Sequence, residues 1–231
     1  MSNRHLLVAA LAALAVACRA QPQQADQFPR PHRPVAPIVS DSFSTEDARD
    51  RVGEAEQVMD LAGIAEGMWV ADIGAGEGYY TVRLARAVGP KGRVLAEDIV
   101  PGTRDRLAMR VQRENLDNVA VRLGKADDAM LPPQSFDRIL MVHMYHEVES
   151  PYALLWRLRE GLKPGGEIVV VDANRPANRH GMPPNLLVCE FKVIGLDLVR
   201  FQRLSDGESY FAAFRAARPR PQPDSISACK A

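Results

Sequence analysis

The chain has 231 residues, and its 29 basic residues balance 29 acidic ones. This zero net charge counts against the nucleic-acid-binding proteins, which usually carry a basic excess, and against binding to an anionic membrane surface. Hydrophobic residues at 46% and charged residues at 25% are ordinary for a soluble globular protein, and the length suits one substantial domain with tails.

The first 20 residues are expected to be a signal peptide. Arg4 precedes an uncharged apolar run from Leu6 to Cys18, which is too short to span a bilayer. The small residues before Cys18 resemble a bacterial lipobox, although Ala15 stands where that motif normally has Leu. Lipidation of Cys18 and cleavage after Ala20 are both open. We therefore expect an exported protein, either periplasmic or held at the membrane by a lipid anchor.

The sequence divides the rest of the chain into three parts. Residues 21–41 are rich in proline and glutamine and are expected to form an extended linker. Residues 42–217 are expected to form the folded domain, and 218–231 a disordered tail. We expect Cys189 and Cys229 to be free thiols, and the sequence shows no Cys/His spacing typical of a metal site.

Apolar periodicity within the domain predicts strands alternating with helices. A first helix is expected from Ser44 to Leu61, and later helices at 80–88, 102–115, 151–162 and 184–194. The expected strands are 68–73, 93–99, 119–126, 136–142, 168–172, 197–203 and 210–217. Such alternation predicts a parallel sheet. The last two strands are only six residues apart, which suits a hairpin, so the final strand should be antiparallel.

A glycine-rich segment follows the first predicted strand. Asp72 is followed by Gly74, Gly76 and Gly78, so that a strand ends in glycines and a helix begins directly after them. Glycines let a ligand approach the backbone, and the helix start offers unpaired N–H groups. The third glycine comes one position early for the G-x-G-x-x-G pattern of dinucleotide-binding folds. The segment resembles the first motif of the class I S-adenosylmethionine-dependent methyltransferases.

This resemblance covers nearly all of residues 45–217. It implies S-adenosylmethionine as the cofactor, and a Rossmann-like fold with seven strands, mostly parallel with an antiparallel last strand, and helices on both faces. Asp98 matches the acidic residue that binds both ribose hydroxyls in the family. Asp127 matches the residue that contacts the adenine amino group, with Asp128 as the alternate. Residues 162–166 resemble the turn before strand five in small-molecule members.

The methyl acceptor is expected near the end of the fourth strand. His146 is the first candidate for a general base, because a histidine titrates near neutral pH and can take a proton from an acceptor. Tyr145 and Glu147 are possible orienting partners, and His143 is a further catalytic candidate. The competing interpretation is that this segment only caps the sheet.

The loop after the fifth strand, residues 174–185, carries Arg175, Arg179 and His180 and is either a substrate lid or a solvated linker. Among family branches the chain is most similar to the small-molecule and quinone-type methyltransferases, which implies a small or lipid-like acceptor. Two other functions are weighed against this one. An exported, non-catalytic binding protein would keep the fold without turnover, and a nicotinamide-dependent oxidoreductase is disfavoured by the glycine spacing.

Overall fold

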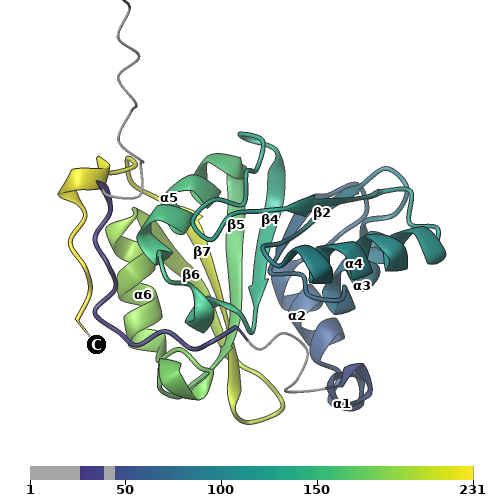
Figure 1. The fold of residues 1–231 in the computed structure, drawn as a ribbon, viewed down its shortest axis with the longest axis horizontal. Coiled ribbons are helices and arrows are strands. Elements are labelled where there is room, and N and C mark those ends of the chain that lie inside the picture. The colour runs from purple at the N-terminus through teal and green to yellow at the C-terminus, as the bar shows by residue number, and fades with distance from the viewer. Residues whose placement is uncertain (1–26, 39–44, 231) are drawn as a thin grey trace, which may run out of the picture.

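Seven strands in the part of the chain that the structure describes, residues 27–38 and 45–230, form one sheet (Figure 1). In this computed structural model the strands lie side by side in the order β3-β2-β1-β4-β5-β7-β6. Their bounds are β1 Trp69–Ile73, β2 Arg93–Asp98, β3 Val119–Leu123, β4 Phe136–Val142, β5 Leu162–Ala173, β6 Leu196–Arg203 and β7 Ser209–Ala216.

The predicted fold class is confirmed. Strands β1 to β5 pair in parallel, whereas β7 pairs antiparallel with both β5 and β6. The short connection between β6 and β7 therefore makes the expected hairpin, and β7 is the one reversed strand of this described sheet. The result is the Rossmann-like arrangement of class I methyltransferases.

Helices cover both faces of the sheet because side chains alternate along each buried strand. On β4, Ile139 and Met141 pack in the cluster that contains α5 and α6, and Leu140 packs with α2 and α3. The helices are α1 Glu46–Arg51, α2 Glu54–Ala62, α3 Tyr79–Val88, α4 Pro101–Arg113, α5 Pro151–Gly161 and α6 Pro184–Val193. Short 3₁₀ helices are η2 Tyr145–Glu147, η3 Ala177–Arg179 and η4 Pro223–Ser225.

The prediction of one helix from Ser44 to Leu61 is wrong. The structure has two helices, α1 and α2, separated at Gly53, whose φ of 63° places it in the left-handed region. That conformation ends a right-handed helix and is one that glycine adopts without strain. Val52 and Gly53 thus turn the chain, and α1 lies beyond α2, away from the sheet (Figure 1).

The prediction of a disordered tail is also wrong for residues 218–230, here called the C-terminal tail. The indole N–H of Trp156 on α5 donates to the Pro221 carbonyl at 2.9 Å. The Cys229 amide donates to the Tyr152 hydroxyl at 2.8 Å, and Cys229 forms a disulfide with Cys189 on α6. The expectation of free thiols is therefore corrected. The polar, proline-rich composition gave no sign of these contacts, because they depend on residues far away in the sequence.

Residues 27–38, here called the N-terminal strap, pack against the domain, contrary to the expected extended linker. Phe28 lies edge-on to Trp156 with ring centroids 5.7 Å apart, and Arg33 and Ala36 are buried. His32 forms an isolated β-bridge with Lys230, so the strap and the C-terminal tail lie side by side. The rest of the predicted linker, the predicted signal peptide and Cys18 lie outside the described residues. Among the helices that are described, none has the length and hydropathy needed to span a membrane.

Removing the disulfide is expected to lower the free energy of unfolding by about 2–4 kcal/mol. The bond closes a loop of 40 residues, and the cross-link restricts the unfolded chain. Urea unfolding of Cys229→Ser against the oxidised wild type measures the change. Reductant should lower the stability of the wild type to that of the variant and leave the variant itself unchanged. Equal midpoints for oxidised wild type and variant would contradict the prediction.

Candidate functional site

A cavity of about 840 Å³ lies at the carboxyl ends of the parallel strands, here called the glycine-loop cavity. It lies where β1 and β4 are neighbours and the strand order reverses direction, the usual position for ligands in open α/β sheets. Its volume is within the range of small-molecule sites. Residues 74–77 of the glycine loop (74–78) line it, together with the end of β2 and residues 142–144 and 146–149.

The glycine loop needs its glycines for two different reasons. Gly74 and Gly76 have φ of 66° and 58° and line the cavity. A Cβ on Gly74 would lie 2.9 Å from the Met144 side chain. Gly78, with φ of 93°, caps α3 and does not line the cavity, and a Cβ there would lie 2.6 Å from Leu107 on α4. Gly74 and Gly76 thus shape the cavity wall, and Gly78 allows α3 and α4 to pack.

Asp98 and Asp72 take different positions beside this loop. Asp98 lines the cavity, and its carboxylate accepts hydrogen bonds from the Gly76 amide at 3.0 Å and the Val100 amide at 2.8 Å. Asp72 is buried beneath the loop, where the Thr81 hydroxyl donates to it at 2.6 Å. Burial raises the pKa of Asp72 to about 6. Asp98 can therefore contact a ligand in the cavity, whereas Asp72 supports the loop from below.

The structure does not bring Asp127 and Asp128 into the cavity wall. Arg157 on α5 donates to the Asp127 carboxylate at 2.8 Å, and the Met130 amide donates to Asp128 at 2.7 Å. Lys125 and Ala126 line the cavity in their place. Arg157 also lies 3.9 Å from the Asp128 carboxylate, so both carboxylates face α5 and not the cavity.

Glu97 is a buried acid of the cavity wall that the sequence analysis did not select. It precedes Asp98 on β2, is 1% exposed and lines the cavity. Burial, together with the negative charge of Asp98, raises the pKa of Glu97 to about 8. Near neutral pH the side chain therefore holds a proton, and it becomes an anion when a positive charge is placed beside it.

Glu97→Gln is expected to stabilise the protein at pH 8 and to leave it little changed at pH 5. The folded state keeps a proton that the unfolded state releases above pH 4.5, so wild-type stability falls as the pH rises from about 4.5 to about 8. The amide of the variant does not ionise in this pH range. The variant therefore avoids this fall in stability, which amounts to a few kcal/mol. Urea unfolding of both proteins at the two pH values measures it. Parallel pH profiles would show that Glu97 ionises normally.

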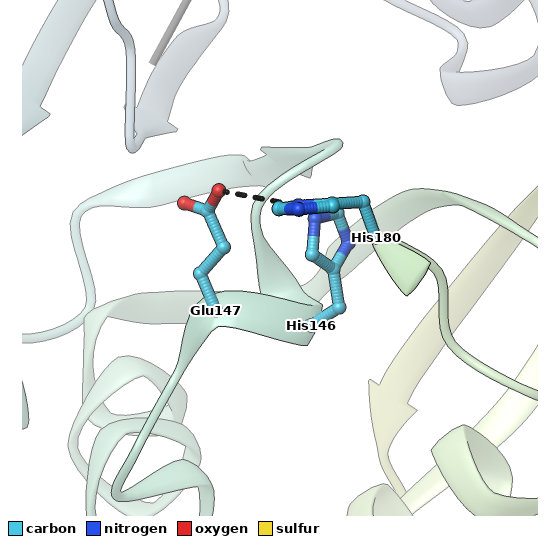
Figure 2. A group of neighbouring side chains, drawn as sticks. All are labelled: His146, Glu147 and His180. Carbon is cyan, nitrogen blue, oxygen red and sulfur yellow. Dashed lines mark ion pairs between the residues drawn. The ribbon is translucent and has the colours of Figure 1, made fainter. Parts of the chain in front are cut away.

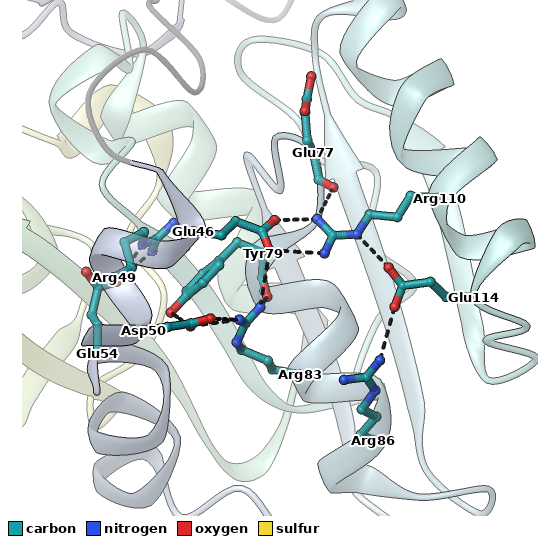
Figure 3. A network of polar contacts seen from close by, with 10 residues as sticks. All are labelled: Glu46, Arg49, Asp50, Glu54, Glu77, Tyr79, Arg83, Arg86, Arg110 and Glu114. Atoms are coloured by element: carbon teal, nitrogen blue, oxygen red, sulfur yellow. Dashed lines mark hydrogen bonds and ion pairs between the residues drawn. The ribbon is translucent and has the colours of Figure 1, made fainter. Parts of the chain in front are cut away.

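Helix α1 forms one side of the cavity and is fixed by a polar network (Figure 3). Arg110 on α4 bonds to Glu46 of α1 and to the Glu77 carbonyl of the glycine loop. Asp50 accepts from Arg83 at 2.7 Å and from the Tyr79 hydroxyl at 2.8 Å. These contacts tie α1 to α3, to α4 and to the glycine loop, so the first described helix is part of the site.

His146 lines the cavity and is 3% exposed; it follows β4, on the opposite side of β1 from Asp98 at the end of β2. Its Nδ1 lies 2.9 Å from the carboxylate of Asp172, the buried residue that ends the apolar run of β5. A carboxylate can only accept, so Nδ1 carries a hydrogen, and the neutral form of this ring has its lone pair on Nε2. Asp172 is thus an orienting partner that sequence analysis missed. It lies 26 positions from His146, and only the pairing of β4 with β5 brings the two ends together.

The other two catalytic candidates are engaged elsewhere. His143 lines the cavity, but its Nε2 lies 3.3 Å from Glu54 of α2. Burial raises the pKa of Glu54, but His143 and Arg49 outweigh it and bring that pKa to about 2. Tyr145 is fully buried, does not line the cavity, and donates its hydroxyl to Glu190 at 2.7 Å. The structure therefore does not place Tyr145 where it can touch an acceptor.

The N-terminal strap supports the His146 segment from the other side. Arg33 is buried and donates to Glu190 at 3.0 Å and to the Tyr145 carbonyl at 3.3 Å. The Ala36 amide donates to the His146 carbonyl at 3.1 Å. Ala36 is also part of the cavity wall, as are residues 37 and 38. A segment with the composition of a linker therefore helps to form the site.

The loop after β5 contributes two of its three candidate residues. Arg175 and His180 line the cavity, whereas Arg179 on η3 does not. Glu147 lines it as well, with its Oε1 4.0 Å from Nδ1 of His180. His146, Glu147 and His180 together are here called the acceptor end of the cavity. The loop is therefore not wholly a solvated linker, and its role as a substrate lid stays a prediction.

Comparisons with known proteins agree with this geometry. Residues 70–166 match a family model described as a methyltransferase domain. A protein-L-isoaspartate O-methyltransferase of Methanothrix thermoacetophila is 30% identical over 48% of this chain and 50% of that protein. The ubiquinone/menaquinone biosynthesis C-methyltransferase UbiE of Hahella chejuensis is 29% identical over 52% and 49%. The chain thus spans about half the length of these curated relatives. The UbiE of Enterobacter sp. (strain 638) is 27% identical over 74% of this chain and 67% of that protein.

Solved structures share the fold. A S-adenosylmethionine-dependent methyltransferase from Aquifex aeolicus has a TM-score of 0.68 and 24% identity, over 73% of this chain and 93% of that one. The mitomycin 7-O-methyltransferase MmcR has a TM-score of 0.58 and 20% identity, over 74% and 55%. Residues 70–166 thus match a methyltransferase domain model, and the chain has the Rossmann-like fold of these solved methyltransferases.

Proposed function

We propose that this chain is an S-adenosylmethionine-dependent methyltransferase that acts on a small-molecule or lipid-like acceptor. One observation carries the proposal: a single cavity is lined by the glycine loop and Asp98, after β1 and β2, and by His146, held by Asp172, after β4. A cofactor beside the glycine loop would direct its methyl group toward an acceptor beside His146. The matched domain and the quinone C-methyltransferases among the relatives support this assignment.

The residues present fit this cofactor. Gly74 and Gly76 line the cavity in the left-handed region, and at Gly74 a Cβ would lie 2.9 Å from the Met144 side chain. Asp98 keeps acceptor capacity for ribose hydroxyls, because a carboxylate accepts about four hydrogen bonds and two are made here. When bound, S-adenosylmethionine supplies an electrophilic methyl group on a sulfonium. In-line transfer depends mainly on positioning. His146 is proposed to assist loss of the acceptor's proton.

Titration of the chain with S-adenosylhomocysteine, with NADH as the control ligand, tests the cofactor. We expect micromolar binding of S-adenosylhomocysteine alone. Turnover is then tested with a soluble hydroquinone, by following methyl transfer from labelled S-adenosylmethionine. Binding of neither S-adenosylhomocysteine nor NADH would refute the proposed cofactor.

The second candidate function, a non-catalytic binding protein, predicts S-adenosylhomocysteine binding without turnover on any acceptor. Export gives this candidate its force, because S-adenosylmethionine is made in the cytoplasm. The intact glycine loop, Asp98 and the oriented His146 favour catalysis.

We also propose that the protein is exported. The apolar run before Cys18 and the Cys189–Cys229 disulfide support this, because such bonds persist in oxidising compartments. Fractionation of cells that express the wild type and Cys18→Ala tests it. Loss of membrane association in the variant is expected for a lipoprotein, and cytoplasmic recovery of the wild type would refute export.

A further inference from the structure

Three potential metal ligands meet at the acceptor end of the cavity (Figure 2). His146 and Glu147 lie on η2, and His180 follows η3. One ligand atom from each lies within 4.8 Å of those of the other two. The two imidazole rings are perpendicular, with centroids 5.4 Å apart. Sequence analysis expected no metal site because His180 is 34 positions from His146 and only the fold brings them together.

Two imidazoles and one carboxylate are a ligand set that binds divalent transition metals and leaves coordination positions open for a substrate. We propose that His146, Glu147 and His180 bind one divalent transition-metal ion at the acceptor end, where it holds an oxygen atom of the methyl acceptor. This inference rests on the proposed function for the identity of the acceptor, but the metal site can be tested without it.

The orientation of His146 suits a ligand. Its Nδ1 is held by Asp172, which leaves Nε2 for the metal. Histidine ligands in metal sites commonly donate their other ring N–H to a carboxylate, which fixes the ring and makes the ligand nitrogen more basic. Asp172 is 0% exposed, so this contact is shielded from water.

The electrostatics of the acceptor end also suit a dication. The carboxylates of Glu147 and Asp172 supply two negative charges, and both imidazoles bind a metal in their neutral form. The side chains of His146, Glu147 and His180 are 4%, 14% and 18% exposed, so few water molecules compete for the ion.

The distances require only a small closure. Ligand atoms in a tetrahedral zinc site with bonds of about 2.0–2.1 Å lie about 3.4 Å apart. Oε1 of Glu147 and Nδ1 of His180 are 4.0 Å apart, and the three ligand atoms are within 4.8 Å. Neither Glu147 nor His180 lies on a strand, so we expect side-chain rotation to close this difference without moving β4 or β5.

The metal would activate an acceptor that carries a hydroxyl, such as a phenol or hydroquinone. Coordination lowers the pKa of the hydroxyl, and its proton passes to solvent. The resulting oxygen anion forms the bond to the methyl carbon as the carbon–sulfur bond breaks, and the electron pair of that bond remains on sulfur. His146 then assists proton loss by holding the metal.

Metal binding is measured on the full chain after removal of metals with a chelator. Zn²⁺ is titrated by calorimetry, and Co²⁺ by its visible absorption. We expect one ion per chain with a micromolar or lower dissociation constant. His180→Ala, and Glu147→Gln as a variant of nearly the same shape, should each weaken binding by about 10- to 100-fold. His32→Ala, which removes an exposed histidine outside the cavity, should bind as the wild type does.

The metal site would be overturned if the wild type bound no stoichiometric metal. It would also be overturned if Glu147→Gln and His180→Ala both bound metal as tightly as the wild type. S-adenosylhomocysteine binding is measured on the same samples. Binding of S-adenosylhomocysteine without metal binding would refute this inference alone. Metal binding without S-adenosylhomocysteine binding would refute the proposed function and leave the metal site supported.

Discussion

Replacing Gly76 by valine is expected to weaken S-adenosylhomocysteine binding by at least about 100-fold, which corresponds to about 2.7 kcal/mol. Gly76 lines the cavity with φ of 58°, and its amide donates to Asp98. A β-branched residue in the left-handed region costs about 1–3 kcal/mol. Valine would therefore turn the amide away from Asp98 or fill the ligand's space. Calorimetric titration of the variant measures the loss.

Gly165→Val is the matched control for this variant. Gly165 has φ of 80°, and a Cβ there would meet no atom within 4 Å, so its valine is strained without entering the cavity. We expect it to lower stability and to keep wild-type affinity. If Gly76→Val binds as tightly as the wild type, the glycine loop is not the nucleotide site. Loss of binding in both variants would indicate general damage from backbone strain.

The sheet could be predicted from the sequence because each signal for it is local. Apolar runs such as Ile168–Val171 and the glycines that end β1 lie in single windows of the chain. The six-residue link between the last two predicted strands was enough to reverse β7. The first helix was misjudged because its apolar spacing continues past Gly53, whereas that residue turns the backbone into a left-handed conformation.

The two ends of the chain were misjudged for a different reason. Proline-rich composition predicts an extended backbone, but it does not indicate whether an extended segment packs against the domain. Arg33 is buried against Glu190, 157 positions away, and Cys229 against Cys189, 40 positions away. Neither partner can be identified from one sequence, because both contacts arise only when α6 is in place beside α5.

The residues of the site also differ in whether local sequence or distant contacts place them. Residues that follow one strand in a known motif, such as Gly74, Gly76 and Asp98, lie in the cavity wall as expected. Asp127 does not, because its ion pair with Arg157 depends on the position of α5. Asp172 at the end of β5 and His180 in the loop after β5 complete the surroundings of His146, and no spacing rule connects them with it.

His146→Ala is expected to lower turnover by about 10²- to 10⁴-fold while S-adenosylhomocysteine affinity stays within about threefold of the wild type. The side chain follows β4, on the opposite side of β1 from Asp98, so we expect cofactor binding not to need it. Asp172→Asn should lower turnover by about 10- to 100-fold, because the amide no longer fixes the hydrogen on Nδ1 and the lone pair on Nε2.

His32→Ala and Asp105→Asn are the controls for these two variants, since both residues are exposed and outside the cavity. Full turnover in His146→Ala would mean that the acceptor is activated elsewhere or needs no activation. Because Asp172 touches His146 and not the cavity, it acts through the histidine. The double variant should therefore be no slower than His146→Ala alone, whereas additive losses would give Asp172 a separate, structural role.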